Sequence, residues 1–367
     1  MKTKLQDLAK EYLELASQDI NTERRELRRK VNDLESERPV VLIDEIPWNE
    51  IAHDSLKLIS EDPFIRASED FLRKRIYQFR HFPGDMVLRP FLAVNKIIRS
   101  TGIGIEVEEQ TLEYETGNNI VAHEYIDQFS RDEDLEKLKM PVITYDKTET
   151  ERRVSLLNDV YDGIIDVVAE GLGRIHVGTW DDISEYRGVS PLLIDLLDRP
   201  DFTHKLVRRL TDIQIHTMKQ YEELGLLDTG LETLHCTASE TGDMPALEED
   251  GKVRLKNVWG RGVAQILASA SKEMREEFDI EYMKETVGLC GMTYYGCCEP
   301  LDTMIDIVEK IPNLRKISVT PWADSVNAAE VIGSRYVYAS KPNPASVAVY
   351  CLDKDNMKKE QGTIMEA

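Results

Sequence analysis

Two neighbouring cysteines are followed by a glutamate and a proline in Tyr295–Pro300, which reads Tyr-Gly-Cys-Cys-Glu-Pro. The thiols of Cys297 and Cys298 and the carboxylate of Glu299 are groups that bind metal ions or act as nucleophiles and bases. The segment ends an apolar run that starts at Met292 and predicts a strand. In chains that alternate strands and helices, ligands bind at the carboxyl ends of parallel strands. We therefore expect a functional site at this point.

A further thiol, Cys236, follows His235 at the end of another expected strand, residues 231–236. Zinc prefers Cys, His and carboxylate ligands, and a catalytic zinc keeps one position open for substrate. The separation of 61 positions between Cys236 and Cys297 (297 − 236) is too long for a zinc finger and suits two strands that meet in space. Adjacent strand residues point to opposite faces, so only one residue of each pair should enter the site. The predicted metal ligands are His235, Cys236, Cys297 and Cys298, and the alternative is buried thiols that pack as small apolar side chains.

Other groups that could hold substrate or carry protons follow the ends of further expected strands. The predicted catalytic residues are Glu299, His176 and Asp85. The predicted substrate-binding residues are Arg89, Trp180, Trp322, Asp324, Lys341 and Asn343. Each has a structural alternative: Asp85 and Arg89 can pair with each other, and His176 and Trp180 can cap the core.

The elements that must position these residues alternate regularly after Pro141. Apolar runs typical of strands lie near residues 142–145, 164–169, 231–236, 264–267, 292–298, 316–319 and 336–339. Between them, helices are predicted near residues 148–161, 202–226, 272–286, 302–311 and 326–332. Such alternation indicates an α/β fold with a parallel sheet, either a closed (β/α)8 TIM-type barrel or an open doubly wound sheet. Because a barrel brings every strand end to one rim, we predict the barrel.

The N-terminal part differs from this pattern. Residues 1–38 are predicted to form a helical extension, with helical character from Leu5 to about Glu37, and residues 39–367 the barrel. Residues 39–48 read as a buried strand that leads into an acidic bend, and residues 102–114 as a hairpin with one solvated face. The Gly-x-Gly stretches at 171–173 and 260–262 do not complete a dinucleotide-binding fingerprint.

Charge and composition exclude some partners. The 367 residues include 46 Lys and Arg and 68 Asp and Glu, which gives a formal net charge of −22. This negative charge disfavours binding to nucleic acid and to anionic membrane surfaces. Neither a membrane span nor a secretory signal is visible, so we expect a cytoplasmic protein. Five cysteines in a reducing compartment favour free thiols or metal ligands over disulfides.

Four stretches carry a resemblance to a known family. They are Trp-Gly-Arg-Gly-Val-Ala-Gln at 259–265, Tyr-Gly-Cys-Cys-Glu-Pro at 295–300, Ile-Ser-Val-Thr-Pro-Trp at 317–322 and Lys-Pro-Asn-Pro at 341–344. From about Pro39 onward the chain resembles the uroporphyrinogen decarboxylase superfamily, and within it the corrinoid-dependent methyltransferases. The resemblance implies a (β/α)8 barrel with its active site at the carboxyl rim. It also implies a further strand and helix beyond residues 354–365, so the barrel should either close differently or lack its last repeat.

The methyltransferase branch implies a zinc site and a corrinoid cofactor. Because no Asp-x-His-x-x-Gly signature is present, the corrinoid is expected on a separate partner protein. The branch binds zinc through His-x-Cys and a later Cys, whereas His235 and Cys236 are adjacent here. Decarboxylases of the family carry basic residues near the N-terminus where this chain has acidic Asp44 and Glu45, which disfavours a tetrapyrrole with many carboxylates.

We therefore expect a methyltransferase that moves a methyl group between a small methylated substrate and a corrinoid protein, with zinc activating the substrate, and a homodimer as one possible assembly. A first alternative is a metal-free decarboxylase or lyase that uses Arg89, Lys341 and His176. A second is a barrel that binds ligands without catalysis.

Overall fold

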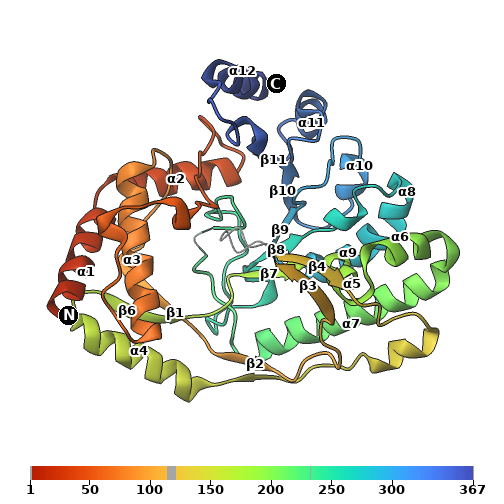
Figure 1. Ribbon diagram of the computed structural model, residues 1–367, viewed down its shortest axis with the longest axis horizontal. Helices are drawn as coiled ribbons and strands as arrows, with labels where there is room; N and C mark the ends of the chain where they lie inside the picture. The colour runs from red at the N-terminus through yellow and green to blue at the C-terminus, as the bar shows by residue number, and fades with distance from the viewer. Residues whose placement is uncertain (1, 114–120, 232, 367) are drawn as a thin grey trace. The chain divides into compact units, whose positions relative to one another are not determined.

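The computed structural model describes every residue except Met1, Tyr114–Ile120, Glu232 and Ala367 (Figure 1). The chain divides into two compact units, each described by itself. Unit 1 comprises Met1–Arg99, Thr144–Gly173 and Asp228–Asp243, and unit 2 comprises Ser100–Ile143, Arg174–Leu227 and Met244–Ala367. None of the described helices combines the length and the apolar character needed to cross a membrane.

Unit 1 packs four helices around a short parallel strand pair. The helices are α1 (Lys2–Ala16), α2 (Ile20–Asn32), α3 (Pro63–His81) and α4 (Lys147–Tyr161), with 3-10 turns η1 (Trp48–Glu50) and η2 (Asp54–Leu56). Strand β1 (Phe91–Asn95) pairs in parallel with β6 (Asp166–Glu170). Apolar side chains from α1, α3, α4 and both strands share one core, to which Leu8, Leu72, Leu92 and Tyr161 belong. Residues 1–38 thus contribute to the core of unit 1, and a domain boundary at residue 38 stays a prediction.

The helical character predicted from Leu5 to about Glu37 is present in α1 and α2, of which α2 ends at Asn32, and the chain bends between the two helices. The Asn21 side chain donates hydrogen bonds to the carbonyl oxygens of Leu15 at 2.8 Å and Ala16 at 3.2 Å. Carbonyls at the end of a helix have no partner within the helix, and here the Asn21 side chain satisfies two of them, with the Gln18 N–H as a second donor to Leu15 at 3.3 Å. The Asn21 Oδ1 atom also accepts from the Leu88 backbone N–H at 2.8 Å, which fixes the bend to a distant part of the chain.

Unit 2 is built on a five-stranded parallel sheet in the order β11-β10-β9-β8-β7. The strands are β7 (Arg174–Val177), β8 (Trp259–Gly262), β9 (Met292–Tyr295), β10 (Leu314–Val319) and β11 (Val337–Ser340). Figure 1 shows these strands side by side, with helices running along their length. The helices are α5 (Thr179–Arg187), α6 (Val189–Asp198), α7 (Pro200–Glu223), α8 (Lys272–Arg275), α9 (Glu281–Thr286), α10 (Ile305–Val308), α11 (Ser325–Ile332) and α12 (Lys354–Glu366), and a π-helical turn η6 (Glu276–Ile280) joins α8 to α9.

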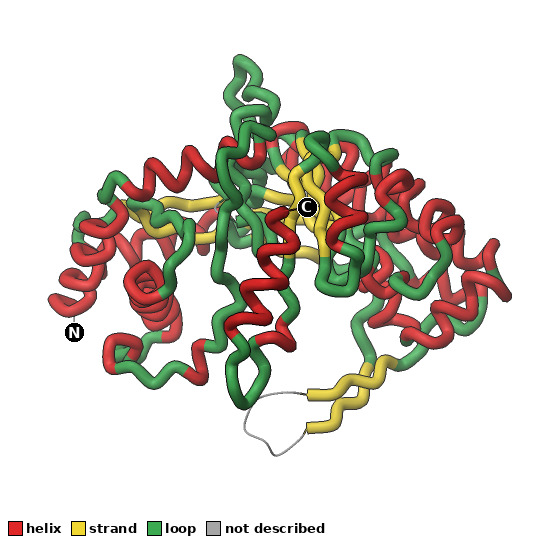
Figure 2. The backbone as a smooth tube through the Cα atoms, turned by 90° about the horizontal axis from the view of Figure 1, so that it is seen from above, coloured by secondary structure: helices red, strands yellow, loops and turns green. Residues whose placement is uncertain are grey.

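Unit 2 also carries a hairpin and several short turns. Strand β3 (Glu109–Glu113) pairs antiparallel with β4 (Val121–Tyr125), and Figure 2 shows the two strands as an arm. The hairpin predicted over residues 102–114 therefore starts later than expected, and Tyr114 lies outside the described residues. The turns of unit 2 are η3 (Asp132–Lys137), η4 (Leu255–Asn257), η5 (Gln265–Leu267), η7 (Val287–Leu289) and η8 (Pro344–Ser346). Strands β2 (Ile98–Ser100) and β5 (Ile143–Tyr145) form a further pair, and each includes residues assigned to both units.

The α/β class with parallel strands is confirmed, and a closed eight-stranded barrel stays a prediction. Three strand predictions are wrong. Residues 39–48 contain no strand, residues 233–238 form a turn with one isolated bridge, and residues 265–267 form η5, just after β8. The sequence missed β8 and also β7, since His176 was expected in a loop after a strand.

Candidate functional site

The candidate site in unit 2 lies at the carboxyl edge of its parallel sheet. Gly178 follows β7, Val263 follows β8, Gly296 follows β9, Thr320 follows β10 and Lys341 follows β11. Since neighbouring strands are parallel, all five segments leave the sheet at the same edge. Ligands of open and closed α/β sheets bind at this edge. We call it the sheet edge.

The two faces of this sheet differ in character. Gly260 and Gly262 point to the face that packs against helices: a Cβ at Gly262 would lie 2.7 Å from the Met283 Sδ atom on α9. The Gly-x-Gly stretch thus allows close packing of a helix on β8. Strand alternation turns Arg261 to the opposite face.

One row of residues crosses that opposite face. In register, His176 of β7 pairs with Arg261 of β8, Arg261 with Tyr294 of β9, and Tyr294 with Lys316 of β10. The Arg261 guanidinium and the Lys316 amine each lie 5.8 Å from the centre of the Tyr294 ring, within cation–π distance. Arg261 is 3% exposed and Lys316 is 1% exposed. This face therefore concentrates positive charge inside a strongly acidic chain.

His176, a predicted catalytic residue, is held in a defined state by Arg261. The Arg261 Nη1 atom lies 3.1 Å from the His176 Nδ1 atom. A guanidinium can only donate, so Nδ1 must accept and the neutral ring carries its proton on Nε2. Desolvation of the ring and the charges of Arg261 and Arg174 lower the pKa of His176 to about 4, although the residue as a whole is exposed. His176 is thus a neutral hydrogen-bonding group at pH 7.

Glu299, the predicted catalytic carboxylate, is fully buried and holds the loop after β9. Its Oε2 atom accepts from the Cys297 backbone N–H at 2.8 Å, and its Oε1 atom accepts from the Ala264 N–H at 3.2 Å. The Arg275 Nη2 atom lies 3.7 Å from Oε1. These contacts join the ends of β8 and β9. Glu299 therefore positions the two loops, and its catalytic role stays a prediction.

Beneath Glu299 lies a buried network that sequence reasoning missed. The Arg275 Nη2 atom donates to the Tyr295 hydroxyl at 3.2 Å, and that hydroxyl donates to the Asp279 carboxylate. Burial raises the pKa of Asp279 to about 6. Arg275 and Asp279 are four residues apart across the start of η6, and π-turns of this kind are frequent near functional sites. The spacing Arg-x-x-x-Asp on a helix was the only available signal.

Asp181 adds a further carboxyl group that the sequence reasoning did not single out. It is half-buried in the first turn of α5. Burial and the neighbouring charge of Glu299 raise the pKa of Asp181 to about 6. A carboxyl group that titrates close to neutral pH can act as an acid or a base. Asp181 is therefore suited to proton transfer, as is its neighbour Asp182, because burial also raises the pKa of Asp182 to about 6.

The vicinal thiols stand at the tip of the loop after β9. Their Sγ atoms lie 3.7 Å apart, with Cys297 half-buried and Cys298 exposed, and neither forms a disulfide. Desolvation, followed by the neighbouring Cys297, raises the pKa of the Cys298 thiol, so it stays protonated at pH 7. The Lys341 Nζ atom donates to the Cys297 carbonyl oxygen at 2.8 Å.

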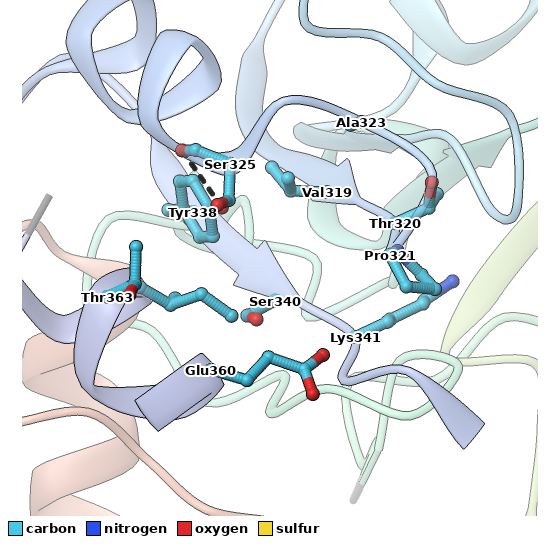
Figure 3. A pocket seen from close by; sticks show the side chains of 11 residues that line it. Val319, Thr320, Pro321, Ala323, Ser325, Tyr338, Ser340, Lys341, Glu360 and Thr363 are labelled. Atoms are coloured by element: carbon cyan, nitrogen blue, oxygen red, sulfur yellow. Dashed lines mark hydrogen bonds between the residues drawn. The ribbon is translucent and has the colours of Figure 1, made fainter. Parts of the chain in front are cut away.

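Lys341 borders a cavity of about 280 Å³ at the ends of β10 and β11. Figure 3 shows Lys341 beside Pro321 on one side, Glu360 of α12 on another, and the Tyr338 hydroxyl bonded to Ser325. Glu360 is engaged by the Ser346 hydroxyl at 3.0 Å. The cavity is small and partly polar. The amine of Lys341, the lysine that lines it, already donates a hydrogen bond to the Cys297 carbonyl oxygen.

The remaining residues predicted at this edge have structural contacts. Trp180 is 1% exposed and donates from Nε1 to the Phe278 carbonyl oxygen at 3.0 Å, within the core. Trp322 is 64% exposed. Asp324 caps α11 and Asn343 caps η8 through their side-chain oxygens. The structure thus brings Glu299, Cys297, Cys298 and Lys341 together and places Trp180 apart from them.

In unit 1, Asp85 and Arg89 do not pair with each other. Asp85 is buried and accepts from Arg38 at 2.7 and 2.9 Å and from the Val41 N–H at 2.8 Å. Arg89 binds both carboxylate oxygens of Glu170 and donates to the Gly230 carbonyl oxygen at 2.9 Å. Both residues therefore hold loops in place.

Cys236 lies in a tight turn rather than at a strand end. His235 and Cys236 have φ values of 41° and 61°, and the Leu234 N–H donates to the Thr237 carbonyl oxygen at 2.8 Å. Positive φ at two successive residues is the geometry of a type I′ turn, which side chains other than Gly and Asn adopt at a cost. Glu45 also has a positive φ of 55°. Glu232, part of the predicted strand, lies outside the described residues.

This turn brings Cys236 to two carboxylates. The Cys236 Sγ atom lies 3.7 Å from the Glu45 Oε1 atom. Ligand atoms of Asp44, Glu45 and Cys236 all lie within 4.8 Å of one another, and we call them the acidic thiol cluster. His235 neighbours the cluster in sequence, whereas Cys297 and Cys298 belong to unit 2. One thiolate and two carboxylates are a donor set that zinc accepts, with a fourth position left for another ligand.

Asp44 and Glu45 also line a cavity of about 490 Å³ in unit 1. Trp48, Phe71 and Lys74 contribute to its wall, and the Lys74 amine lies 5.7 Å from the centre of the Trp48 ring. Small-molecule sites have volumes of about 300–1,000 Å³ and combine apolar walls with a few polar groups. The acidic thiol cluster therefore borders a space large enough for a small ligand.

Comparison with known proteins identified no matching family model and no significantly similar curated protein.

Proposed function

We propose that the chain is a zinc-dependent methyltransferase that moves a methyl group between a small methylated substrate and a corrinoid held by a separate protein. One observation carries the proposal: the acidic thiol cluster of Asp44, Glu45 and Cys236 borders the 490 Å³ cavity of unit 1. A metal with a free position beside such a cavity is the arrangement that activation of a substrate heteroatom requires.

The residues would divide the work as follows. Cys236, Asp44 and Glu45 would hold the zinc ion. When bound, zinc polarises a heteroatom or keeps a thiol ionised at neutral pH. Trp48 and Phe71 would shield the methyl group, and Lys74, whose amine pairs with Asp70 at 2.6 Å, adds a polar part to the wall.

The four stretches that resemble the methyltransferases support a (β/α)8 barrel as the complete fold. Residues 259–265 cover β8 and its end, and 295–300 follow β9. Residues 317–322 cover the end of β10, and 341–344 follow β11. All four therefore fall at one edge of one parallel sheet, as the rim of a barrel would require.

The metal-free decarboxylase is less well supported. It needs Arg89 and Lys341 as substrate-binding cations, but Arg89 is bound to Glu170, and Lys341 donates to the Cys297 carbonyl oxygen. His176 can still act as a hydrogen-bonding group, but Arg89 and Lys341 are not available to bind a substrate beside it.

Metal content tests the proposal. We expect about one zinc ion per chain in protein purified without chelators, and Cys236→Ala should lower the zinc content by at least about tenfold because it removes the only thiolate of the set. Cys290→Ala is the matched control, since Cys290 is buried and burial raises the pKa of its thiol to about 12. Wild-type protein without stoichiometric zinc, or full zinc retention in Cys236→Ala, would refute the assigned site.

Methyl transfer requires its own assay. With methylcobalamin as a surrogate for the corrinoid protein, zinc-loaded wild type should release the methyl group to a thiol acceptor, visible as loss of the methyl–cobalt absorbance. Glu45→Gln should slow this release. A rate equal to that of free zinc would contradict the proposed activity.

A further inference from the structure

The guanidinium of Arg261 is buried, and the carboxylate of Asp181 acts on it only from beyond ion-pair distance. Arg261 is 3% exposed, and its Nε atom has no hydrogen-bond partner. Its contacts are the hydrogen bond to neutral His176 and the face of the Tyr294 ring. Among the described residues, no carboxylate lies within ion-pair distance of Arg261. A buried charge without a partner is costly, so such a group indicates a missing anion.

Other buried arginines of unit 2 do not share this state. Arg187 is 6% exposed, and its Nε atom donates to Asp195 at 2.6 Å while Nη1 donates to Asp127 at 2.7 Å. Arg275 is 1% exposed and also has Nε and Nη1 atoms without a hydrogen-bond partner, but its Nη2 atom lies 3.7 Å from the Glu299 carboxylate. The contrast shows that burial of arginine in this unit normally comes with a carboxylate.

The surroundings of Arg261 fit a carboxylate. Guanidinium groups bind carboxylates through parallel hydrogen bonds, and the Nε edge of Arg261 is unused. Lys316, in the same row, adds a second positive charge, and its amine lies 5.5 Å from the centre of the Trp259 ring. Tyr294 and Trp259 give flat apolar surfaces that suit an aromatic or aliphatic body. His176 contributes its Nε2–H as a neutral donor.

We propose that the polar face of the unit 2 sheet, centred on Arg261 with His176 and Lys316, is a binding site for the carboxylate of a small organic acid. His176, Arg261 and Tyr294 are each one residue before the carboxyl ends of β7, β8 and β9, near the edge where ligands of α/β sheets bind. This proposal rests on the buried position and the unused Nε atom of Arg261. It does not depend on the proposed zinc site or on methyl transfer.

Binding of benzoate and of its uncharged near-isostere benzamide to the metal-free full-length chain tests this site by calorimetry. Benzoate should bind at least about tenfold more tightly than benzamide, since hydrogen bonds to charged groups contribute at least this much. Arg261→Gln should weaken benzoate binding by at least about tenfold and leave benzamide unchanged. Arg335→Gln is the matched control, because Arg335 is an exposed arginine of the same unit that pairs with Glu309.

The comparison of the two ligands on wild type needs no variant, so it holds even where Arg261→Gln fails to fold. Equal binding of benzoate and benzamide, or unchanged benzoate binding by a folded Arg261→Gln, would overturn the proposal. Binding of inorganic phosphate without binding of benzoate would overturn the assignment to a carboxylate. Calorimetry measures benzoate binding without metal and without catalysis. The result therefore remains valid even if the protein proves to bind no zinc.

Discussion

Glu299 should prove to be a stability residue of unit 2. Glu299→Ala leaves the backbone N–H groups of Ala264 and Cys297 without an acceptor and the Arg275 guanidinium without its carboxylate. Each orphaned buried donor costs about 1–3 kcal/mol, and loss of one member of a buried ion pair costs about 3–5 kcal/mol. Because these losses overlap, we expect a fall of about 4 kcal/mol in the free energy of unfolding. Glu299→Gln keeps one acceptor oxygen and should lose about 2 kcal/mol.

Urea unfolding followed by tryptophan fluorescence measures this difference. Trp180, Trp259 and Trp322 lie in unit 2 and only Trp48 lies in unit 1, so the signal reports mainly on the unit that changes. The shift of the midpoint at constant slope gives the change in free energy. Glu330→Ala, an exposed site on α11, should stay within about 0.5 kcal/mol of wild type. The reasoning fails if Glu299→Ala also stays within that range, or if Glu299→Gln is the less stable variant.

The remaining predictions concern acid stability and packing. The pKa of His176 is about 4 in the fold and about 6.5 in the unfolded chain, so its stabilising contribution is present above pH 6.5 and is lost as pH falls towards 4. His176→Asn should therefore lose less stability than wild type between pH 7 and pH 5 in urea titrations, and an equal loss would contradict the assigned neutral state. Gly262→Ala places a Cβ atom 2.7 Å from the Met283 Sδ atom and should cost about 1–3 kcal/mol by overpacking. Gly362→Ala in α12, with nothing within 4 Å, should show no loss, and a Gly262→Ala variant as stable as this control would refute the close contact of β8 and α9.

The sequence was a good guide to the strand ends of unit 2. The run from Met292 ends in the predicted loop, and Cys297, Cys298 and Glu299 do lie at the edge of a parallel sheet. The periodic spacing of apolar residues also placed α4, α7 and α11 within a few residues. These successes rely on local patterns that strands and helices follow wherever they pack.

The sequence misled where contacts came from distant segments. Cys236 ends a short apolar run, but His235 and Cys236 adopt positive φ, and no Gly or Asn marked the turn. Asp44 and Glu45 read only as an acidic bend, since nothing local indicates that they meet a thiol almost two hundred positions away. Arg261 stands between two glycines in a stretch without the apolar run that marks a strand, and strand β8 was missed. Whether a carboxylate pairs with Arg261 depends on residues distant in sequence, so only the structure shows that none lies within ion-pair distance among the described residues.

The role of the acidic thiol cluster is the central claim, and zinc X-ray absorption spectroscopy on the zinc-loaded chain tests it most directly. We predict one sulfur ligand at about 2.3 Å and oxygen ligands at about 2.0–2.2 Å, with the sulfur signal lost in Cys236→Ser. A zinc ion with two or more sulfur ligands, or with none, would contradict the assignment of Asp44, Glu45 and Cys236 as its ligands.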